Sequence, residues 1–218
     1  MEMDLFEYAQ ERELPKATAR SAAWEEPGAT PWGRAWLDNV ARICRPRYAS
    51  ELAFGEKLLE AGRMTACRVR QAHVQAAFTN REGGTVLVNL DVRPLAAKPW
   101  AALDALCDRC GDALFTADEL PDEVSAGLFG QPNGLLPELK DLSFSCSHCH
   151  TPFCLYRAAT LLAAAAEFDR APIRLFELRG AAPGTLLARA AGLARDDEET
   201  IPEEDLSALF GIELECSK

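Results

Sequence analysis

Three features of the amino-acid sequence predict an α+β fold. Residues 63–93 alternate between apolar and polar positions, which is the two-residue period of a half-buried β-strand. The segments on either side repeat their apolar residues every three or four positions, as amphipathic helices do. Between residues 146 and 154, cysteine and histidine are unusually dense. We therefore expect a small antiparallel β-meander, surrounding short helices, and a cysteine-rich knuckle followed by a helix.

Two short helices are expected before the meander. The first covers residues 33–43, with Trp36 and Val40 on its apolar face. Residues 45–47 break it, because the proline at their centre removes a backbone hydrogen bond from the helix interior. The second helix covers residues 50–60 and is followed by a terminating glycine.

The meander itself is predicted to contain three strands. Residues 64–70 form the first strand, and the alternating patterns of residues 74–78 and 86–92 form the second and third. Residues 80–84, which contain asparagine and two glycines, supply the turn between the last two strands. Each strand should bury one face.

Further helical patterns follow the meander, and prolines punctuate them. The glycine- and proline-rich residues 127–137 should form a loop, and Pro172 should stop the helix that precedes it. The expected helices cover residues 100–107, a piece from Pro121, residues 155–169, and pieces that open at Pro183 and Pro202.

The chain divides into four expected segments. Residues 1–30 form an N-terminal extension, and residues 31–130 hold helices and the three-stranded meander. Residues 131–180 contain the cysteine-rich knuckle and its helix. Residues 181–218 hold C-terminal helices and an acidic linker, in which seven of the ten residues from Asp196 to Asp205 are acidic.

Composition limits the class of protein. Hydrophobic residues make up 48% of the 218 residues, as in a globular protein. No apolar run reaches about 18 residues, so no membrane span is expected. The N-terminus is acidic where a secretory signal would be basic and then apolar. We predict a cytoplasmic protein, whose eight cysteines are reduced thiols or metal ligands rather than disulfides.

The segment Cys146-Ser-His-Cys-His-Thr-Pro-Phe-Cys154 carries the strongest chemical signal. Thiolate sulfur and imidazole nitrogen are the ligands of tetrahedral zinc. Cys146 can share a metal with His148 along an extended segment, or with Cys149 across a tight turn. Cys154 opens the helix, where free backbone N–H groups favour a thiolate. The predicted ligands of Zn²⁺ are Cys146, His148, Cys149 and Cys154.

Alternative ligands are present nearby and upstream. His150 lies in the same knuckle, and Cys107-Asp-Arg-Cys110 is a second paired-cysteine feature. Cys107 and Cys110 could complete an all-cysteine site with Cys146 and Cys149, because two C-x-x-C pairs separated by 35 residues have the general form of a zinc ribbon. Cys44, Cys67 and Cys216 stand alone and are interpreted as small hydrophobic residues.

The cysteine-rich segment resembles the SWIM zinc finger of bacterial SWIM-family proteins. The family pattern is C-x-C, a short spacer, and C-x-H opening a helix. Cys146 and Cys154 match its first and third ligand positions, His148 stands at the second position in place of a cysteine, and Tyr156 replaces the final histidine. Pro31-Trp-Gly-Arg-Ala-Trp-Leu37 and Leu175-Phe-Glu-Leu-Arg-Gly180 are similar to flanking family segments, and the resemblance extends over about residues 30–213.

This resemblance implies that residues 131–180 are a SWIM-like zinc finger that binds proteins or DNA. Since tyrosine is a poor zinc ligand, the resemblance implies either a metal-free relic or a site completed by neighbouring ligands. The formal net charge of −11 repels phosphate, and the arginines near the finger are scattered. A protein partner is therefore the first hypothesis, and contact with DNA or RNA is the second.

An enzymatic role is not expected. Cys107 and Cys110 have the spacing of a thiol–disulfide exchange pair, and a redox protein is the alternative hypothesis from a different class. However, this pair is expected to follow a helix where a redox pair precedes one, and no βαβ pattern surrounds it. The sequence also contains no phosphate-cradling glycine loop and no nucleophile motif.

Overall fold

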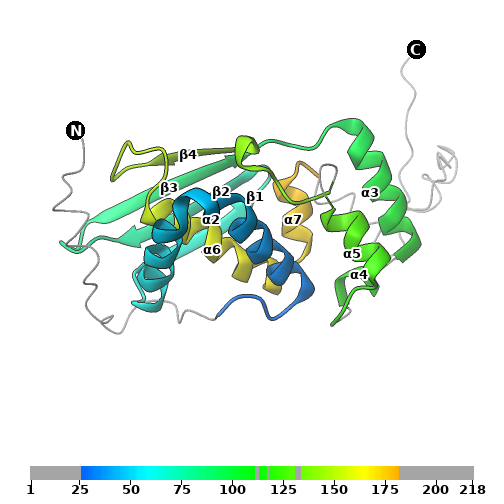
Figure 1. The fold of residues 1–218 in the computed structure, drawn as a ribbon, viewed down its shortest axis with the longest axis horizontal. Helices are drawn as coiled ribbons and strands as arrows, with labels where there is room; N and C mark the ends of the chain where they lie inside the picture. Colours follow the sequence, from blue (N-terminus) through cyan, green and yellow to red (C-terminus); the bar gives the residue numbers. More distant parts are fainter. Residues whose placement is uncertain (1–25, 111–112, 117, 131–133, 182–218) are drawn as a thin grey trace, which may run out of the picture.

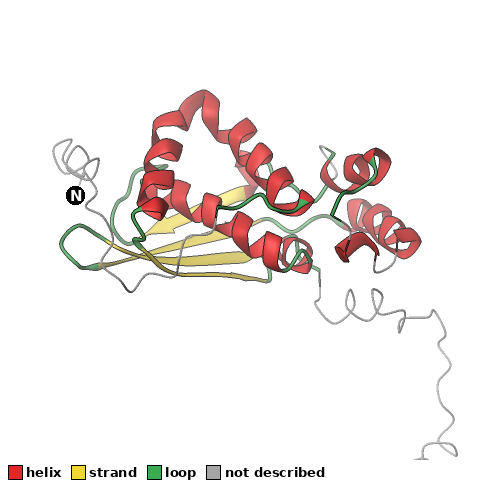
Figure 2. Ribbon diagram, turned by 90° about the horizontal axis from the view of Figure 1, so that it is seen from below, coloured by secondary structure: helices red, strands yellow, loops and turns green. Residues whose placement is uncertain are grey.

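The computed structural model of the protein describes residues 26–110, 113–116, 118–130 and 134–181. It contains a four-stranded antiparallel sheet with helices on one face (Figures 1 and 2). The predicted α+β class is therefore confirmed. The helices expected from Pro183 and Pro202, the acidic linker and most of the N-terminal extension lie outside the described residues.

The sheet has one strand more than predicted. Strands β1 (Met64–Arg70), β2 (His73–Thr79) and β3 (Thr85–Val92) form the expected meander, and β4 (Leu142–Cys146) pairs with β3. The sequence analysis includes these five residues in the segment 131–180 but predicts no strand there, because so short an alternating stretch does not distinguish a strand from an extended loop. The addition of β4 joins the segments 31–130 and 131–180 in one sheet.

One face of the sheet is buried and the other is open to solvent. Alternate residues of β2 and β3, from Val74 to Phe78 and from Val86 to Val92, are 0–2% exposed and pack beneath the helices. The open face is polar, with a row of hydrogen-bonded amides at Gln75 and Asn89. Among the described residues, Leu87 on this face is the large hydrophobic side chain that stands out as exposed, at 45%.

Helix α2 (Pro31–Glu60) replaces the two predicted helices. Its backbone leaves helical geometry at Tyr48, where φ is −127° and ψ is 32°. Pro46 has no N–H to donate to the preceding turn, which is the common cause of such kinks. The predicted break at residues 45–47 is thus a bend within one helix.

Helix α6 (Leu155–Arg170) lies between α2 and the sheet. Its alanines allow the neighbouring elements to approach closely on all sides, and nearly every residue of the helix is buried. At Gly55 of α2, an added Cβ would lie 2.7 Å from the backbone nitrogen of Ala159, so this crossing requires glycine. The indole nitrogen of Trp36 donates to the carbonyl of Leu161 at 2.7 Å.

The C-terminal end of α6 caps the start of α2. The carboxylate of Asp169 accepts hydrogen bonds from the backbone N–H groups of Gly28 and Thr30, at 2.6 and 2.9 Å, and from the Thr30 hydroxyl at 2.6 Å. Burial alone would raise the pKa of Asp169, but these hydrogen bonds outweigh it and the pKa is lowered. The capping carboxylate therefore stabilises the α2–α6 pair.

Helices α3 (Ala97–Cys110), α4 (Ala113–Thr116) and α5 (Asp122–Phe129) pack together at one end of the molecule (Figure 1). The 3₁₀ turn η1 (Leu139–Asp141) directly precedes β4, and α7 (Ile173–Leu178) follows α6. α3 starts before the predicted Trp100 and extends to Cys110, and α5 extends into the predicted loop of residues 127–137. Pro172 ends α6 as expected and is also the N-cap of α7. In the described ranges, no helix is both long and apolar enough to cross a bilayer.

Candidate metal site

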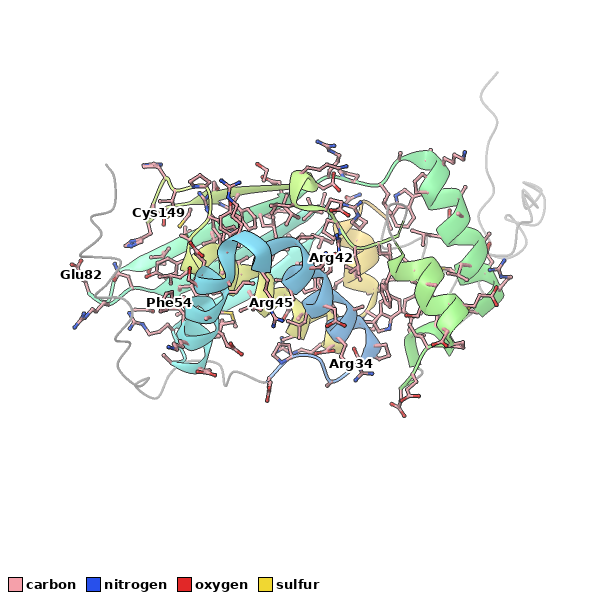
Figure 3. The ribbon with its side chains drawn as sticks, viewed as in Figure 1. Arg34, Arg42, Arg45, Phe54, Glu82 and Cys149 are labelled. Carbon is pink, nitrogen blue, oxygen red and sulfur yellow. The ribbon has the colours of Figure 1, made fainter. Side chains whose placement is uncertain are left out.

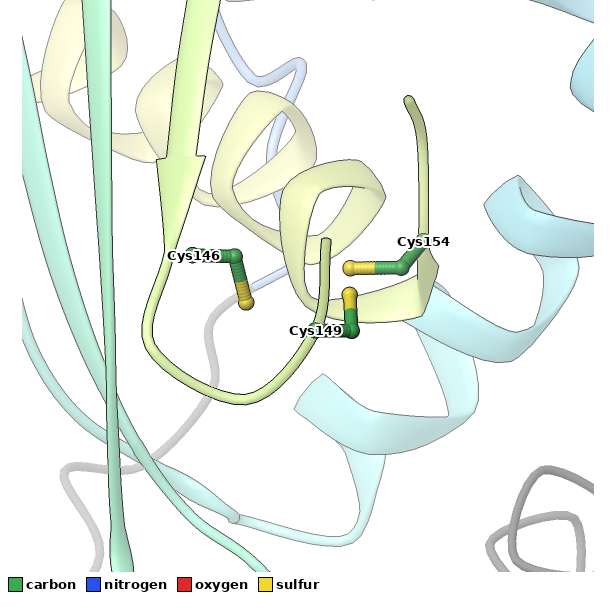
Figure 4. A group of neighbouring side chains, drawn as sticks. All are labelled: Cys146, Cys149 and Cys154. Atoms are coloured by element: carbon green, nitrogen blue, oxygen red, sulfur yellow. The ribbon is translucent and has the colours of Figure 1, made fainter. Parts of the chain in front are cut away.

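Three cysteines meet where β4 gives way to α6. Cys146 is the last residue of β4, Cys149 lies on the connecting loop, and Cys154 is the N-cap of α6. Their three sulfur atoms all lie within 4.8 Å of one another. Figure 4 shows the side chains converging from the strand, the loop and the helix start. Zinc–thiolate bonds of about 2.3 Å would separate tetrahedral sulfurs by about 3.8 Å, so the cluster can hold a metal ion with little adjustment.

Strand pairing and helix capping orient the first and last of these thiols. Beyond the end of β4, Ser147 donates its backbone N–H to the carbonyl of Leu87 at 2.9 Å, and Leu87 donates its own N–H to the Ser147 hydroxyl at 2.9 Å. This pairing keeps the preceding cysteine on the helix side of the sheet. Cys154 has extended backbone angles, and its carbonyl accepts the first helical hydrogen bond from Ala158 at 2.9 Å.

A buried arginine holds the loop between Cys149 and Cys154. Arg157 of α6 is 6% exposed, and its guanidinium donates to the carbonyls of Thr151 and Pro152, the latter at 2.6 Å. The guanidinium carbon also lies 5.9 Å from the centre of the Phe144 ring. Two carbonyls and an aromatic face offset the cost of burying this cation, and together they define the shape of the loop.

An aromatic stack connects the same loop to the bend of α2. The Phe153 ring stacks on Tyr48 with centroids 4.6 Å apart and meets Phe144 edge-on at 5.7 Å. Tyr48 is the residue at which α2 bends. The position of Cys154, one residue beyond Phe153, therefore depends on packing from α2, β4 and α6 together.

The three thiols share negative charge unequally. Hydrogen bonds from Cys146 and Cys154 lower the pKa of the Cys149 thiol, and a further contact to the Thr151 hydroxyl lies at 3.2 Å. Hydrogen bonds with Cys146 and Cys149 raise the pKa of Cys154, and the hydrogen bond with Cys149 raises that of Cys146. The cluster thus favours a single thiolate. Ionisation of all three thiols is disfavoured unless a cation compensates their charge.

The surroundings of the cluster are apolar. Cys149 and Cys154 are 3% and 1% exposed. They belong to the smaller of two apolar clusters, together with Phe78, Val88 and Tyr156. A metal ion held here would be shielded from bulk water, which strengthens charge interactions between the ion and its thiolates.

The structure separates the predicted ligands into those that meet and those that do not. Cys146, Cys149 and Cys154 come together, and in the described part of the chain no histidine or carboxylate joins their group. His148 is half-buried and its ring lies edge-on to Tyr156, with centroids 5.1 Å apart. His150 is exposed. The role of His148 as a ligand stays a prediction.

The second cysteine pair lies elsewhere. Cys107 and Cys110 occupy the last turn of α3, at the opposite end of the molecule from Cys149 (Figures 1 and 3). The zinc ribbon built from two C-x-x-C pairs is therefore not formed in this structure. The sequence analysis expects this pair to follow the helix, but in the structure both cysteines lie within it. Cys44 and Cys67 fit their interpretation as small hydrophobic residues, since burial raises their pKa values to about 11 and about 12.

Comparison with protein-family models, with curated proteins and with solved structures finds no match to this chain. The metal site is thus supported by its own geometry. Its likeness to SWIM fingers stays a prediction.

The sequence analysis overlooks two contributors to the site, Arg157 and Phe153. Arg157 leaves a detectable signal, because it lies in a helix whose buried residues are mostly alanine and leucine. An arginine in such a helix has to find acceptors within the protein. Phe153 leaves no comparable signal, since its partner Tyr48 lies more than 100 residues away.

Proposed function

We propose that this protein binds one structural Zn²⁺ through Cys146, Cys149 and Cys154, and that the metal fixes the junction of β4 and α6. The observation that supports this most strongly is the convergence of three sulfur atoms within 4.8 Å. Soft thiolate ligands in a buried, apolar site favour zinc over harder divalent ions. The metal would give the loop a stability that it cannot obtain from its few backbone hydrogen bonds.

His148 is the proposed fourth ligand. Closed structural zinc sites have four protein ligands, and the cysteine cluster supplies three. His148 lies on the same loop immediately before Cys149 and is half-buried, whereas His150 is exposed. Rotation of the His148 ring away from Tyr156 would be needed to complete the site.

Replacement of zinc by Co²⁺ tests this ligand set, because cobalt bound to thiolates absorbs in the near ultraviolet and its visible bands report coordination number. We expect a tetrahedral spectrum with cysteine-to-cobalt charge transfer in the wild type. His148→Ala should change the visible bands, and the matched His150→Ala should not. An octahedral spectrum without charge transfer would contradict the metal site as a whole. If both variants gave the wild-type spectrum, His148 would be excluded as the fourth ligand and the three-cysteine site would remain.

We further propose that the zinc-stabilised fold is an interaction module of SWIM type whose partner is a protein. The open face of the sheet supports this choice. Sheets that bind single-stranded nucleic acid carry aromatic platforms for base stacking. On the described strands, Phe78 and Phe144 lie on the helix side, and the open face presents Leu87 among polar side chains without a Phe, Tyr or Trp.

Titration of fluorescent duplex and single-stranded DNA at physiological salt tests the choice of partner. We expect no binding tighter than about 10⁻⁶ M, the upper range of non-specific affinity. Raising the salt concentration should abolish any residual signal, because counterion release would be its main source. Salt-resistant binding below this concentration would favour the nucleic-acid hypothesis instead.

A further inference from the structure

The outer side of β4 is an unpaired edge of the sheet. β4 pairs with β3 on one side and is the outermost strand on the other (Figure 1). At its two ends, Ser147 donates its N–H to the carbonyl of Leu87, and the carbonyl of Asp141 accepts from the residue after β3. The odd-numbered residues of this segment therefore face β3, and the even-numbered ones point their backbone groups outward. Within the described ranges, the outward N–H and C=O of Phe144 meet no further strand.

The opposite edge of the sheet, at β1, has features that oppose pairing with another strand. Arg68 and Arg70 are exposed there, so two copies meeting at β1 would bring arginines together. The register of β1 with β2 also shifts between Met64 and Ala66, and such irregularities interrupt an edge. β4 contains no charged residue, no proline and no register shift. The two edges therefore differ, and β4 is the one that can accept a strand.

Polar side chains on the open face lead up to the β4 edge. The Gln75 amide donates to Asn89 at 3.1 Å, and Asn89 donates to the Ser145 hydroxyl at 3.3 Å. In the neighbouring row, Asp91 lies opposite Ser143. Both serines are exposed, and both rows end at them. A strand with small polar residues at the facing positions would continue these rows.

We propose that two copies of this chain pair edge to edge through β4, antiparallel, with Phe144 on the two-fold axis. The two Phe144 residues would exchange both of their backbone hydrogen bonds. Ser143 would lie opposite Ser145 of the second copy, which joins the polar rows without opposing like charges. β4 is thus its own complement in this register, as a two-fold interface requires. The inference names a partner for the interaction module, so it rests on the protein-binding role proposed above and not on the bound metal.

Sedimentation of the full-length protein over a range of concentrations tests the pairing. We expect the mean mass to rise from the monomer value of 23.8 kDa towards twice that value. Amide hydrogen exchange should also slow at Phe144 as the concentration rises, because its N–H gains a partner only in the dimer. Ser143 and Ser145 are the controls, since their N–H groups face β3 in both states. A protein that stays monomeric at about 1 mM would overturn self-pairing and leave the protein-binding role to a partner of different sequence.

A charge series at the two exposed serines provides the second measurement. Ser143→Lys with Ser145→Lys should weaken dimerisation about tenfold, because each introduced lysine would face another across the axis. Ser143→Lys with Ser145→Glu should restore the wild-type affinity, since each lysine would then face a glutamate. Ala66→Lys adds a charge at the β1 edge and should leave dimerisation unchanged. Equal affinities in the two serine variants, or loss of the dimer in Ala66→Lys, would contradict pairing through β4.

Discussion

Two cysteine pairs with the same spacing behave differently in this protein. Cys107 and Cys110 lie in the last turn of α3, where the first is 8% exposed and both contact the larger apolar core. Cys146 and Cys149 lie across the end of a strand, and the turn between them brings a third thiol into range at Cys154. In the described ranges the α3 pair gains no third ligand. Spacing alone therefore identifies a pair, whereas a metal site needs a ligand from a separate element.

The first way to break this comparison is to remove one thiol from each group. Cys149→Ser should lower the free energy of unfolding by about 3 kcal/mol or more, because metal-binding energy contributes directly to folding in such sites. Cys110→Ser is the matched control and should cost less than about 1 kcal/mol, as a half-exposed side chain with a near-isosteric replacement. Urea denaturation of the two variants in zinc-containing buffer measures the difference. Equal losses of unfolding free energy in the two variants would show that Cys149 stabilises the protein no more than Cys110 does, which would contradict a metal site at Cys149.

Thiol alkylation sharpens the comparison without mutation. In the metal-bound protein, we expect iodoacetamide to modify the half-exposed Cys110 first and to leave the three clustered thiols unmodified. After chelation, Cys149 should react before Cys146 and Cys154, because its pKa is lowered and theirs are raised. Peptide mass spectrometry over time gives the order. Modification of Cys149 at the same rate before and after chelation would argue against bound metal.

The contacts of Arg157 with the loop between Cys149 and Cys154 offer a smaller and more selective perturbation. Arg157→Met removes both hydrogen bonds to the loop carbonyls but keeps an unbranched buried side chain. We expect metal affinity to fall about tenfold to a hundredfold, which is typical for the loss of an interaction that orients ligands. Arg170→Met, at the far end of the same helix, is the control and should leave affinity unchanged. Competition with a chromophoric chelator measures both, and a shared loss would indicate a general effect on α6.

The smallest expected effect separates helix stability from metal binding. Asp169→Asn weakens the cap at the opposite end of α6 and should cost about 1 kcal/mol of folding free energy with full metal retention. Since the folded-state pKa of Asp169 is lowered, its contribution is present above its ordinary pKa and is lost as the pH falls through the lowered value. The stability difference between wild type and variant should therefore shrink in acid. Release of metal by this variant at neutral pH would mean that any loosening of α6 empties the site.

Local pattern predicts most of the described fold. The strands of the meander and the position of α6 follow from periodicity, because burial of one face determines which residues alternate. The bend of α2 at Tyr48 is anticipated only as a break, since a proline signal does not reveal whether tertiary packing continues the helix beyond it. β4 is missed because its strand character comes from pairing with β3, which lies about 50 residues earlier.

The candidate site is predicted to a similar degree. The clustered thiols of Cys146, Cys149 and Cys154 are close in sequence, so their meeting needs little loop closure and can be anticipated. Their separation from Cys107 and Cys110 cannot, because it depends on where α3 packs. The contribution of Tyr48 through Phe153 is likewise a matter of tertiary structure. The sequence therefore anticipates which cysteines converge, and it does not reveal the groups that hold them in place.

Zinc content tests the central claim most directly. Elemental analysis should be made on wild type, Cys154→Ser and Cys110→Ser, each purified without added metal or chelator. We predict about one zinc per chain in the wild type and in Cys110→Ser, and close to none in Cys154→Ser. A wild-type protein without zinc, whose thermal stability is the same with and without added Zn²⁺, would contradict the metal site.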